Sequence, residues 1–194
     1  MKRLGVTGGI GSGKSTICEL LARRGVPIYD SDSRAKKLMN SELQQPIRAL
    51  FGEQAYNDSG LNRAYIASRA FGNPELLARL NAIVHPAVAE DFERWAENFE
   101  GQVQFVALES AILYESGFDS RVDAVLCVDA PLDVRVERTV KRDGSSREEV
   151  EKRVARQRTD VARQNADFVI VTDGKRTLDD LVDELFENLD KLWN

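Results

Sequence analysis

A short stretch near the start of the chain combines glycines, a lysine and a hydroxyl at a spacing that suits phosphate binding. Residues 8–15 read Gly-Gly-Ile-Gly-Ser-Gly-Lys-Ser and fit the pattern G-x-x-x-x-G-K-[ST]. Glycines let successive backbone N–H groups turn inward into an anion-binding nest, which a Cβ would obstruct. A helix that follows the glycines would direct its positive dipole end at the same point. The stretch therefore predicts a P-loop that binds the phosphates of a nucleoside triphosphate.

Individual roles within this loop follow from side-chain chemistry. Lys14 adds a full positive charge near the β- and γ-phosphates, so we expect it to serve both binding and catalysis. Ser15 offers its hydroxyl to Mg²⁺. The remaining phosphate contacts are expected from Gly9, Ile10, Gly11, Ser12, Gly13 and Thr16.

The flanks of the loop supply the context that the motif requires. Residues 3–7 form a short, mostly apolar run that predicts a buried strand, and residues 15–24 have the apolar spacing of a helix. The alternative is a flexible glycine-rich turn, which would need neither the lysine nor these flanks. Strand, loop and helix in this order favour the P-loop.

Two carboxylates follow the second predicted strand, residues 26–29. Asp30 and Asp32 stand where a parallel sheet opens onto its ligand crevice, so we expect them near the P-loop. The alternative is a helix N-cap at Asp32 or Ser33. A cap needs only one such residue, and the presence of two carboxylates favours a catalytic or metal-linked role for at least one.

The next two predicted strands also end in acidic residues. The third, residues 102–108, ends at Glu109, which has the general form of a Walker B element and could help to hold Mg²⁺ through water. The fourth, residues 124–128, stops at Asp129, which could equally cap the helix expected from about Leu132. Glutamate is common at strand ends, so both interpretations of Glu109 stay open.

Residues 34–100 show no strand pattern and predict a helical insertion. Helical spacing covers residues 43–51, 62–71 and 74–84, and Pro86 suits the first turn of a further helix. In folds of this type such an insertion is the place for a second substrate. His85, the one histidine of the chain, would by itself more often be a structural residue at a helix start.

Residues 135–163 are locally basic in an acidic chain. They contain ten basic and six acidic side chains, against a net charge of −5 for the whole sequence. One interpretation is a solvated helical face with ion pairs such as Glu149 with Arg153. The other is a lid that closes arginines over the transferring phosphoryl group and excludes water. The local charge favours the lid, whose second helix would begin in a capping box from Ser146 to Glu149.

The strands and helices alternate along the chain. After a fifth predicted strand, residues 167–171, Thr177 is expected to cap an amphipathic helix that packs over the sheet. Five strands alternating with helices predict a doubly wound, mostly parallel α/β fold. We expect a single P-loop kinase domain over residues 1–194, divided into a core (1–33, 101–138, 164–194), a helical insertion (about 34–100) and a lid (about 139–163).

Composition excludes several classes of protein. With 194 residues, 42% hydrophobic and 30% charged, the chain is typical of a soluble globular protein, and its negative charge argues against a general nucleic-acid binder. No apolar run reaches the roughly eighteen residues of a membrane span. The start of the chain enters the first strand directly, so we expect no signal peptide and a cytoplasmic location. Cys18 and Cys127 are expected to be reduced packing residues.

A P-loop alone does not distinguish a kinase from a GTPase or a motor. The chain lacks a guanine-reading Asn/Thr-Lys-x-Asp motif, whereas a helical insertion and a basic lid are what a small-metabolite kinase needs. Taken together, its motifs resemble those of the dephospho-CoA kinase family. The matching segments are residues 7–15 (TGGIGSGKS), 30–32 (DSD, where the family usually has DAD), 61–63 (LNR), 80–86 (LNAIVHP), 137–144 (ERTVKRDG) and 166–170 (ADFVI).

This resemblance implies transfer of the γ-phosphoryl group of ATP to the ribose 3′-hydroxyl of dephospho-CoA, with Mg²⁺, to give coenzyme A and ADP. It implies that Asp32, or next Asp30, orients or deprotonates that hydroxyl. From the lid, Arg142 would stabilise the transferring group as a catalytic residue, with Arg138 behind it and both in contact with ATP. On the substrate side it implies Arg63, Asn81 and His85, together with the two aspartates.

Two segments depart from the family pattern. Residues 111–115 read AILYE where the family commonly has PLLFE, which leaves the roles of Glu109 and Glu115 open. Residues 170–172 read IVT in place of IDN, which leaves contacts to adenine open as well. Two other functions remain as alternatives, a kinase of the same fold with another acceptor and a nucleotide-dependent switch. We expect a monomer or weak homo-oligomer with no nucleic-acid or membrane partner.

Overall fold

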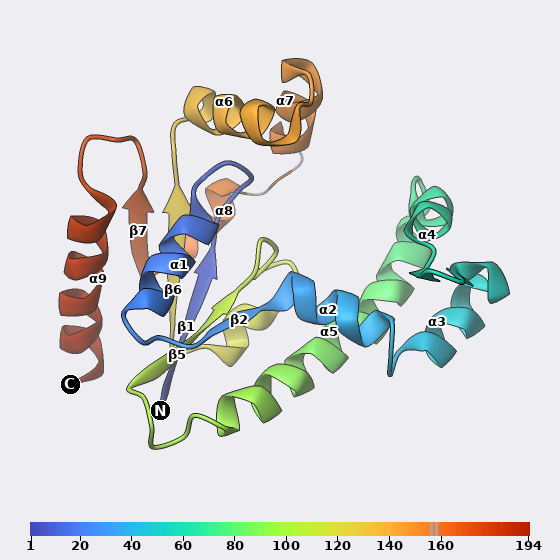
Figure 1. Ribbon diagram of the computed structural model, residues 1–194, viewed down its shortest axis with the longest axis horizontal. Coiled ribbons are helices and arrows are strands. Elements are labelled where there is room, and N and C mark those ends of the chain that lie inside the picture. Colours follow the sequence, from blue (N-terminus) through green and yellow to red (C-terminus); the bar gives the residue numbers. More distant parts are fainter. Residues whose placement is uncertain (156, 158) are drawn as a thin grey trace. The chain divides into compact units, whose positions relative to one another are not determined.

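A computed structural model describes residues 1–155, 157 and 159–194 (Figure 1). Arg156 and Arg158, two of the basic residues assigned to the lid, lie outside the described residues. The chain divides into two compact units, one formed by residues 1–29 with 99–194 and the other by residues 30–98. We refer to them as the P-loop unit and the helical unit.

The P-loop unit is built on a five-stranded sheet. In chain order the strands are β1 (Lys2–Thr7), β2 (Ile28–Asp30), β5 (Phe105–Glu109), β6 (Ala124–Asp129) and β7 (Phe168–Val171), and their order across the sheet is β2-β5-β1-β6-β7. β1 pairs in parallel with β5 and with β6, and β6 pairs in parallel with β7. The predicted α/β fold is confirmed, with the first strand at the centre of the sheet (Figure 1).

The core of this unit lies between the sheet and two helices, α1 (Lys14–Arg23) and α9 (Leu178–Trp193). Leu4 and Leu126 from the strands pack with Ile17 of α1 and Leu185 of α9, and all four are almost fully buried. A parallel sheet covered in this way needs near-continuous apolar strands, as the sequences of β1 and β6 provide. The predicted amphipathic helix is thus confirmed, and the Thr177 side chain caps it by accepting the Asp180 N–H at 3.1 Å.

Both cysteines, Cys18 and Cys127, are buried and free. Burial raises the pKa of the Cys127 thiol to about 11, and the nearby Asp129 carboxylate adds to this effect. The thiol therefore stays protonated and packs as a small apolar side chain, as the sequence predicted.

Three more helices follow β6. They are α6 (Leu132–Asp143), α7 (Arg147–Ala155) and α8 (Thr159–Asn165). The capping box before α7 is confirmed, since Glu149 accepts the Ser146 N–H at 3.0 Å and Ser146 accepts the Glu149 N–H at 3.3 Å. The predicted cap at Asp129 is wrong. Pro131 occupies the N-cap of α6, while Asp129 accepts the Ala130 N–H at 2.8 Å.

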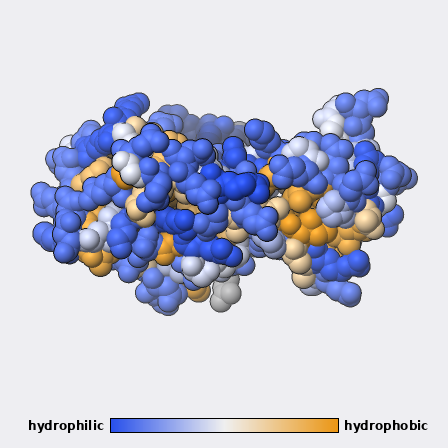
Figure 2. Space-filling model, turned by 90° about the horizontal axis from the view of Figure 1, so that it is seen from below, coloured by the Kyte–Doolittle hydropathy of each residue, from blue (hydrophilic) through white to orange (hydrophobic). Residues whose placement is uncertain are grey.

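The helical unit contains four α-helices among its described residues. They are α2 (Ser31–Met39), α3 (Gln44–Phe51), α4 (Arg63–Ala70) and α5 (Pro74–Glu97), with a single 3-10 turn η1 (Glu53–Ala55). The expectation of no strands in this unit is wrong. The strands β3 (Tyr56–Asn57) and β4 (Gly60–Leu61), each two residues long, pair in an antiparallel hairpin. The helices enclose a small core around Ile47 and Phe51, and Figure 2 shows an apolar area on this unit bordered by hydrophilic residues.

The helix expected to start at Pro86 does not exist as a separate element. α5 runs continuously for 24 residues with Pro86 inside it, and it is Pro74 that occupies the first turn. Val84, Val88 and Phe92 continue one buried stripe past the proline, whose ring faces solvent. Burial of that stripe outweighs the hydrogen bond that proline cannot donate. None of the described helices has the length and apolarity that crossing a bilayer requires.

Candidate active site

The loop at residues 8–13 connects the end of β1 to the start of α1. Gly13 is the N-cap of α1, in the left-handed region at φ 90°, and no side chain caps the helix. The first N–H groups of a helix have no partners within it, and the helix dipole makes them attractive to an anion. α1 therefore presents an uncapped, positively polarised N-terminus, lined by residues Gly13, Lys14, Ser15 and Thr16.

Lys14 forms an ion pair with Glu109 at the end of β5. Only 14% of the Lys14 side chain and 16% of the Glu109 side chain are exposed, so the pair is largely shielded from water. The neighbouring β1 and β5 bring these two predicted residues together. Ser15, next to Lys14 at the helix N-terminus, is exposed.

Two loop glycines are required by close packing against α6. A Cβ at Gly9 would overlap the Arg135 guanidinium and would come within 2.5 Å of the Thr159 methyl group. A Cβ at Gly11 would overlap the Arg135 backbone carbonyl and lie 2.7 Å from the Thr139 hydroxyl. Gly11 also has φ 76°, a conformation that side chains disfavour. The loop is therefore packed closely against the first turns of α6.

Arg135 is the side chain that holds the loop there. It is 5% exposed, its Nε donates to the Ile10 carbonyl at 3.0 Å, and its second amino group donates to Gln157 Oε1 at 3.2 Å. The same Gln157 oxygen accepts the Ile10 N–H at 2.8 Å. Burial lowers the pKa of the Arg135 guanidinium, and the nearby Asp129 carboxylate opposes that shift.

Sequence reasoning missed these contacts. Arg135 was counted among the basic residues of the lid, and neither it nor Gln157 was assigned a role. The sequence offers one indication of the contact between α6 and the P-loop. Arg135 and Thr139 lie four residues apart, so they share the face of α6 that packs against the loop.

Arg138, on the next turn of α6, contacts the P-loop through a different partner. Its guanidinium donates to the Thr172 hydroxyl and to the Thr172 carbonyl, both at 2.7 Å, and to the Gly11 carbonyl at 3.4 Å. The Thr172 hydroxyl donates to the Ser12 carbonyl at 2.7 Å, and Thr172 is 4% exposed. The departure from the family pattern at residue 172 thus has a structural role, because it ties the segment after β7 to the P-loop.

Arg142 lies at the C-terminal end of α6 and is turned to Asp143. Its Nε donates to the Asp143 carboxylate at 2.7 Å, and Arg153 of α7 contacts the same carboxylate at 2.9 Å. These two guanidinium groups lower the pKa of Asp143 to about 2. The solvated-face interpretation pairs Arg153 with Glu149, whereas in the structure Arg153 forms an ion pair with Asp143. The structure brings Arg138 to the P-loop and holds Arg142 in an ion pair within residues 139–163, the segment predicted to form a lid.

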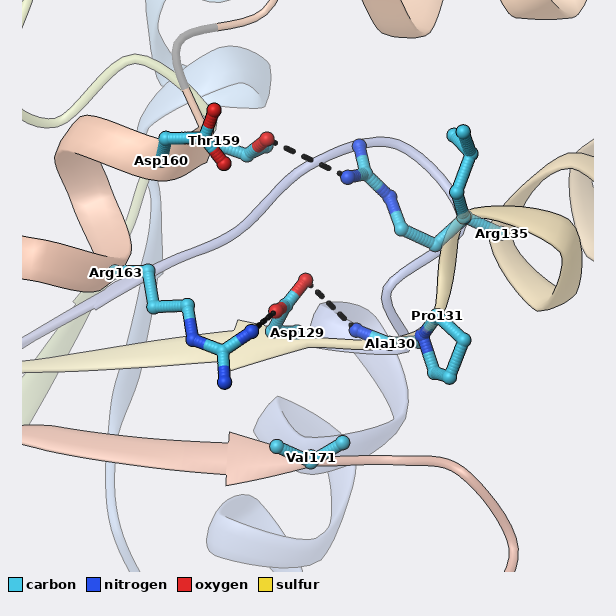
Figure 3. Close-up of a pocket in the computed structure, with 9 residues that line it drawn as sticks. Asp129, Ala130, Pro131, Arg135, Thr159, Asp160, Arg163 and Val171 are labelled. Atoms are coloured by element: carbon cyan, nitrogen blue, oxygen red, sulfur yellow. Dashed lines mark hydrogen bonds and ion pairs between the residues drawn. The ribbon is translucent and has the colours of Figure 1, made fainter.

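A pocket of about 280 Å³ opens beside Arg135 (Figure 3). It lies at the carboxyl ends of β6 and β7, between the start of α6 and α8. Within it Arg163 donates to Asp129 at 2.8 Å, and Arg135 donates to the Thr159 hydroxyl at 3.4 Å. The remaining lining residues are Ala130, Pro131, Leu132, Asp160 and Val171.

In the helical unit, Asp30 acts as the N-cap of α2. Its carboxylate accepts the Ser33 N–H at 3.0 Å and the Ser33 hydroxyl at 2.6 Å, so the alternative of a cap at Asp32 or Ser33 is wrong and the cap is Asp30. The helix begins two residues earlier than the sequence suggested, which makes Asp30 the last extended residue. Asp32 is exposed in the first turn of α2 and takes no part in the cap.

The other predicted substrate residues lie on α4 and α5. Arg63 is the first residue of α4 and is exposed. Asn81 and His85 are partly exposed and lie four residues apart on α5, so they share a helix face. Burial lowers the pKa of His85, which favours the neutral imidazole near neutral pH.

The P-loop after the central strand and the sheet order β2-β5-β1-β6-β7 define a P-loop α/β fold. A shikimate kinase from Bacteroides thetaiotaomicron has a similar fold, with a TM-score of 0.56 and 18% identity over 97% of this chain and 98% of that one. The family model described as dephospho-CoA kinase matches residues 3–177. The chain belongs to the dephospho-CoA kinase family.

Curated relatives agree with this assignment. The dephospho-CoA kinase of Bacteroides fragilis strain YCH46 is 39% identical over 91% of this chain and 87% of its own length. The dephospho-CoA kinase of Porphyromonas gingivalis is 41% identical over 88% of this chain and 86% of its own length. Among solved structures, TT1252 from Thermus thermophilus has a TM-score of 0.83 and 36% identity over 98% of this chain and 97% of that one.

Proposed function

We propose that this kinase transfers the γ-phosphoryl group of ATP to the ribose 3′-hydroxyl of dephospho-CoA, producing coenzyme A and ADP. The observation that carries the proposal is the extent of the family match. Residues 3–177 include the P-loop and the entire helical unit, so the likeness covers more than nucleotide binding.

The P-loop unit provides the donor site. Backbone N–H groups between Gly9 and Thr16 bind the ATP phosphates, except the Ile10 N–H, which donates to Gln157, and the uncapped N-terminus of α1 attracts the phosphate charge. Lys14 neutralises charge that develops on the phosphates, and Glu109 holds its ammonium group at the loop in the absence of nucleotide. Arg138 contacts ATP from α6. Arg142 becomes catalytic when it leaves Asp143 for the transferring group.

Mg²⁺ is the expected metal ion. The described residues contain no cluster of three or more His, Cys, Asp or Glu side chains that could hold a metal by itself. That fits Mg²⁺, which is usually bound by one or two protein oxygens together with waters and substrate phosphates. The exposed Ser15 hydroxyl and the Glu109 carboxylate, the latter through water, would hold it, and the ion would supply charge neutralisation on the phosphates.

The helical unit provides the acceptor site. Asp32 orients the 3′-hydroxyl and accepts its proton as the new bond to phosphorus forms, a role that suits a carboxylate too weak to deprotonate an alcohol beforehand. Because Asp30 is committed to capping α2, it is the second candidate. Arg63, Asn81 and His85 contact the acceptor.

The helices after β6 close the site as a lid and keep water from taking the phosphoryl group. We assign the whole chain to one kinase domain that acts in the cytoplasm as a monomer or weak homo-oligomer, with ATP and dephospho-CoA as its substrates and no nucleic-acid or membrane partner.

A coupled ADP-release assay with a panel of acceptors tests the proposal. Dephospho-CoA, adenosine, AMP and shikimate are compared at equal ATP and Mg²⁺ concentrations. We expect turnover with dephospho-CoA and background rates with the other three. Preference for another acceptor would assign a different small-molecule kinase activity, and ADP release that is independent of acceptor would indicate a nucleotide-dependent switch.

A further inference from the structure

Arg135 places a positive charge in the interior of the P-loop unit without a direct carboxylate partner among the described residues. Its three hydrogen-bond acceptors are a carbonyl, an amide oxygen and a hydroxyl, at Ile10, Gln157 and Thr159. All three are neutral. A buried charge is normally paired with an opposite charge, because neutral acceptors replace only part of its lost hydration. The structure therefore leaves this guanidinium partly uncompensated.

Two carboxylates that line the pocket, Asp129 and Asp160, act on Arg135 through space, and Asp129 is already paired with Arg163. The P-loop lies on the other side, where Arg135 contacts the Ile10 carbonyl and packs over Gly9. A triphosphate bound to the loop would bring several negative charges close to the guanidinium. Nucleotide binding would thus supply the missing counter-charge.

Gln157 extends this arrangement to the lid segment. Its Oε1 accepts from the Ile10 N–H and from Arg135. The Gln157 amide oxygen thereby links Ile10 at the apex of the P-loop to Arg135 of α6. The Ile10 N–H and carbonyl are then both occupied by side chains, which fixes the orientation of that peptide unit in the loop.

We propose that Arg135 and Gln157 are positioning residues for ATP. They hold the Ile10–Gly11 part of the P-loop in its phosphate-binding shape, Arg135 adds charge to that site, and Gln157 makes the shape depend on the lid segment. The inference rests on the proposed function for the identity of the reaction. The claimed effect of Arg135 and Gln157 is on nucleotide affinity, and this affinity can be measured in the absence of any phosphoryl acceptor.

The test compares Arg135→Gln, Arg135→Lys and Gln157→Ala with the wild type. ADP affinity is measured by calorimetry, the ADP-induced rise in Tm by thermal unfolding, and KM for ATP and for dephospho-CoA by the coupled assay. We expect Arg135→Gln and Gln157→Ala to weaken ADP binding and raise KM for ATP about tenfold, with KM for dephospho-CoA changed less than about twofold. Arg135→Lys keeps the charge and should lose less affinity than Arg135→Gln.

Glu148→Gln on α7 is the matched control, because Glu148 is exposed and pairs only with Lys152 in the described contacts. It should leave every readout unchanged. The double variant Arg135→Gln with Gln157→Ala should lose less affinity than the sum of the single losses, since both act on one peptide unit.

The proposal is overturned if ADP affinity and KM for ATP stay within about twofold of wild type, or if Tm falls while the ADP-induced rise in Tm is retained, since a purely structural role predicts that result. If Arg135→Gln does not fold, Gln157→Ala decides the question by the same criteria, because Gln157 is only partly buried. A wild type that binds ADP normally but does not phosphorylate dephospho-CoA would contradict the proposed function and leave this inference standing.

Discussion

The cationic side chains around the P-loop are each fixed by a specific neighbour. Lys14 is paired with Glu109, Arg138 is bound to Thr172 and Arg135 is bound to Gln157. Charged groups that are positioned before the substrate arrives need little reorganisation during the reaction. This preorganisation is the main source of electrostatic stabilisation in enzymes. Arg142, at the C-terminal end of α6, is bound to Asp143 and must give up this partner before it reaches a phosphate.

Asp32→Asn tests the proposed acceptor carboxylate. We expect the variant to fold and bind ATP like the wild type but to lose about 10²- to 10⁴-fold in kcat, the usual contribution of a positioned acid or base. Asp30→Asn distinguishes the two candidate carboxylates, since asparagine caps a helix about as well as aspartate and kcat should stay near the wild-type value if Asp32 is the acceptor carboxylate. Near-normal kcat for Asp32→Asn, measured by the coupled assay, would remove Asp32 from this role.

Tyr114 stands where the family commonly has phenylalanine, and its hydroxyl is buried without a hydrogen-bond partner among the described residues. Burial raises the pKa of Tyr114 to about 12, with Asp119 and Asp167 adding to the effect, so the group stays protonated. An unsatisfied buried hydroxyl costs about 1–3 kcal/mol. We expect Tyr114→Phe to raise the free energy of unfolding by about 1 kcal/mol in urea denaturation. A loss of stability would show that the hydroxyl has a partner in solution.

At the scale of elements, local patterns were informative where local interactions decide the structure. The P-loop, the capping box at Ser146 and the cap at Thr177 depend on residues close in sequence, and all three elements form as predicted. The prediction failed where packing decides. Pro86 normally favours a helix start, but the buried stripe from Val84 to Phe92 carries α5 through it.

Pro86→Ala tests this explanation of α5. Alanine restores the N–H that can donate to the Ala82 carbonyl, and Pro86 is exposed, so little packing is lost. We expect the free energy of unfolding to rise by about 1–2 kcal/mol, less than the full cost of an interior proline because proline also restricts the unfolded chain. Chemical denaturation monitored by helical circular dichroism measures the change. A decrease would mean that the proline shapes α5 in a way the packing requires.

At the scale of the whole molecule, the predicted site residues fall into two units that the structure describes separately. The P-loop unit contains the residues predicted to bind phosphate, and the helical unit contains Asp32, Arg63 and His85. Sequence motifs predicted the members of both sets, because the family resemblance spans both. They could not predict Arg135, Gln157 or Thr172, whose roles arise from contacts between residues more than a hundred positions apart, as in the bond from Ile10 to Gln157.

The most direct test of the central claim is the identity of the product. The protein is incubated with ATP, Mg²⁺ and dephospho-CoA, and the mixture is followed by phosphorus NMR and mass spectrometry. We predict one new phosphomonoester on the ribose 3′-oxygen, formed in equal amount with ADP. Inorganic phosphate without a new ester, or a phosphate on a different hydroxyl, would contradict the assignment of this chain as a kinase for the 3′-hydroxyl of dephospho-CoA.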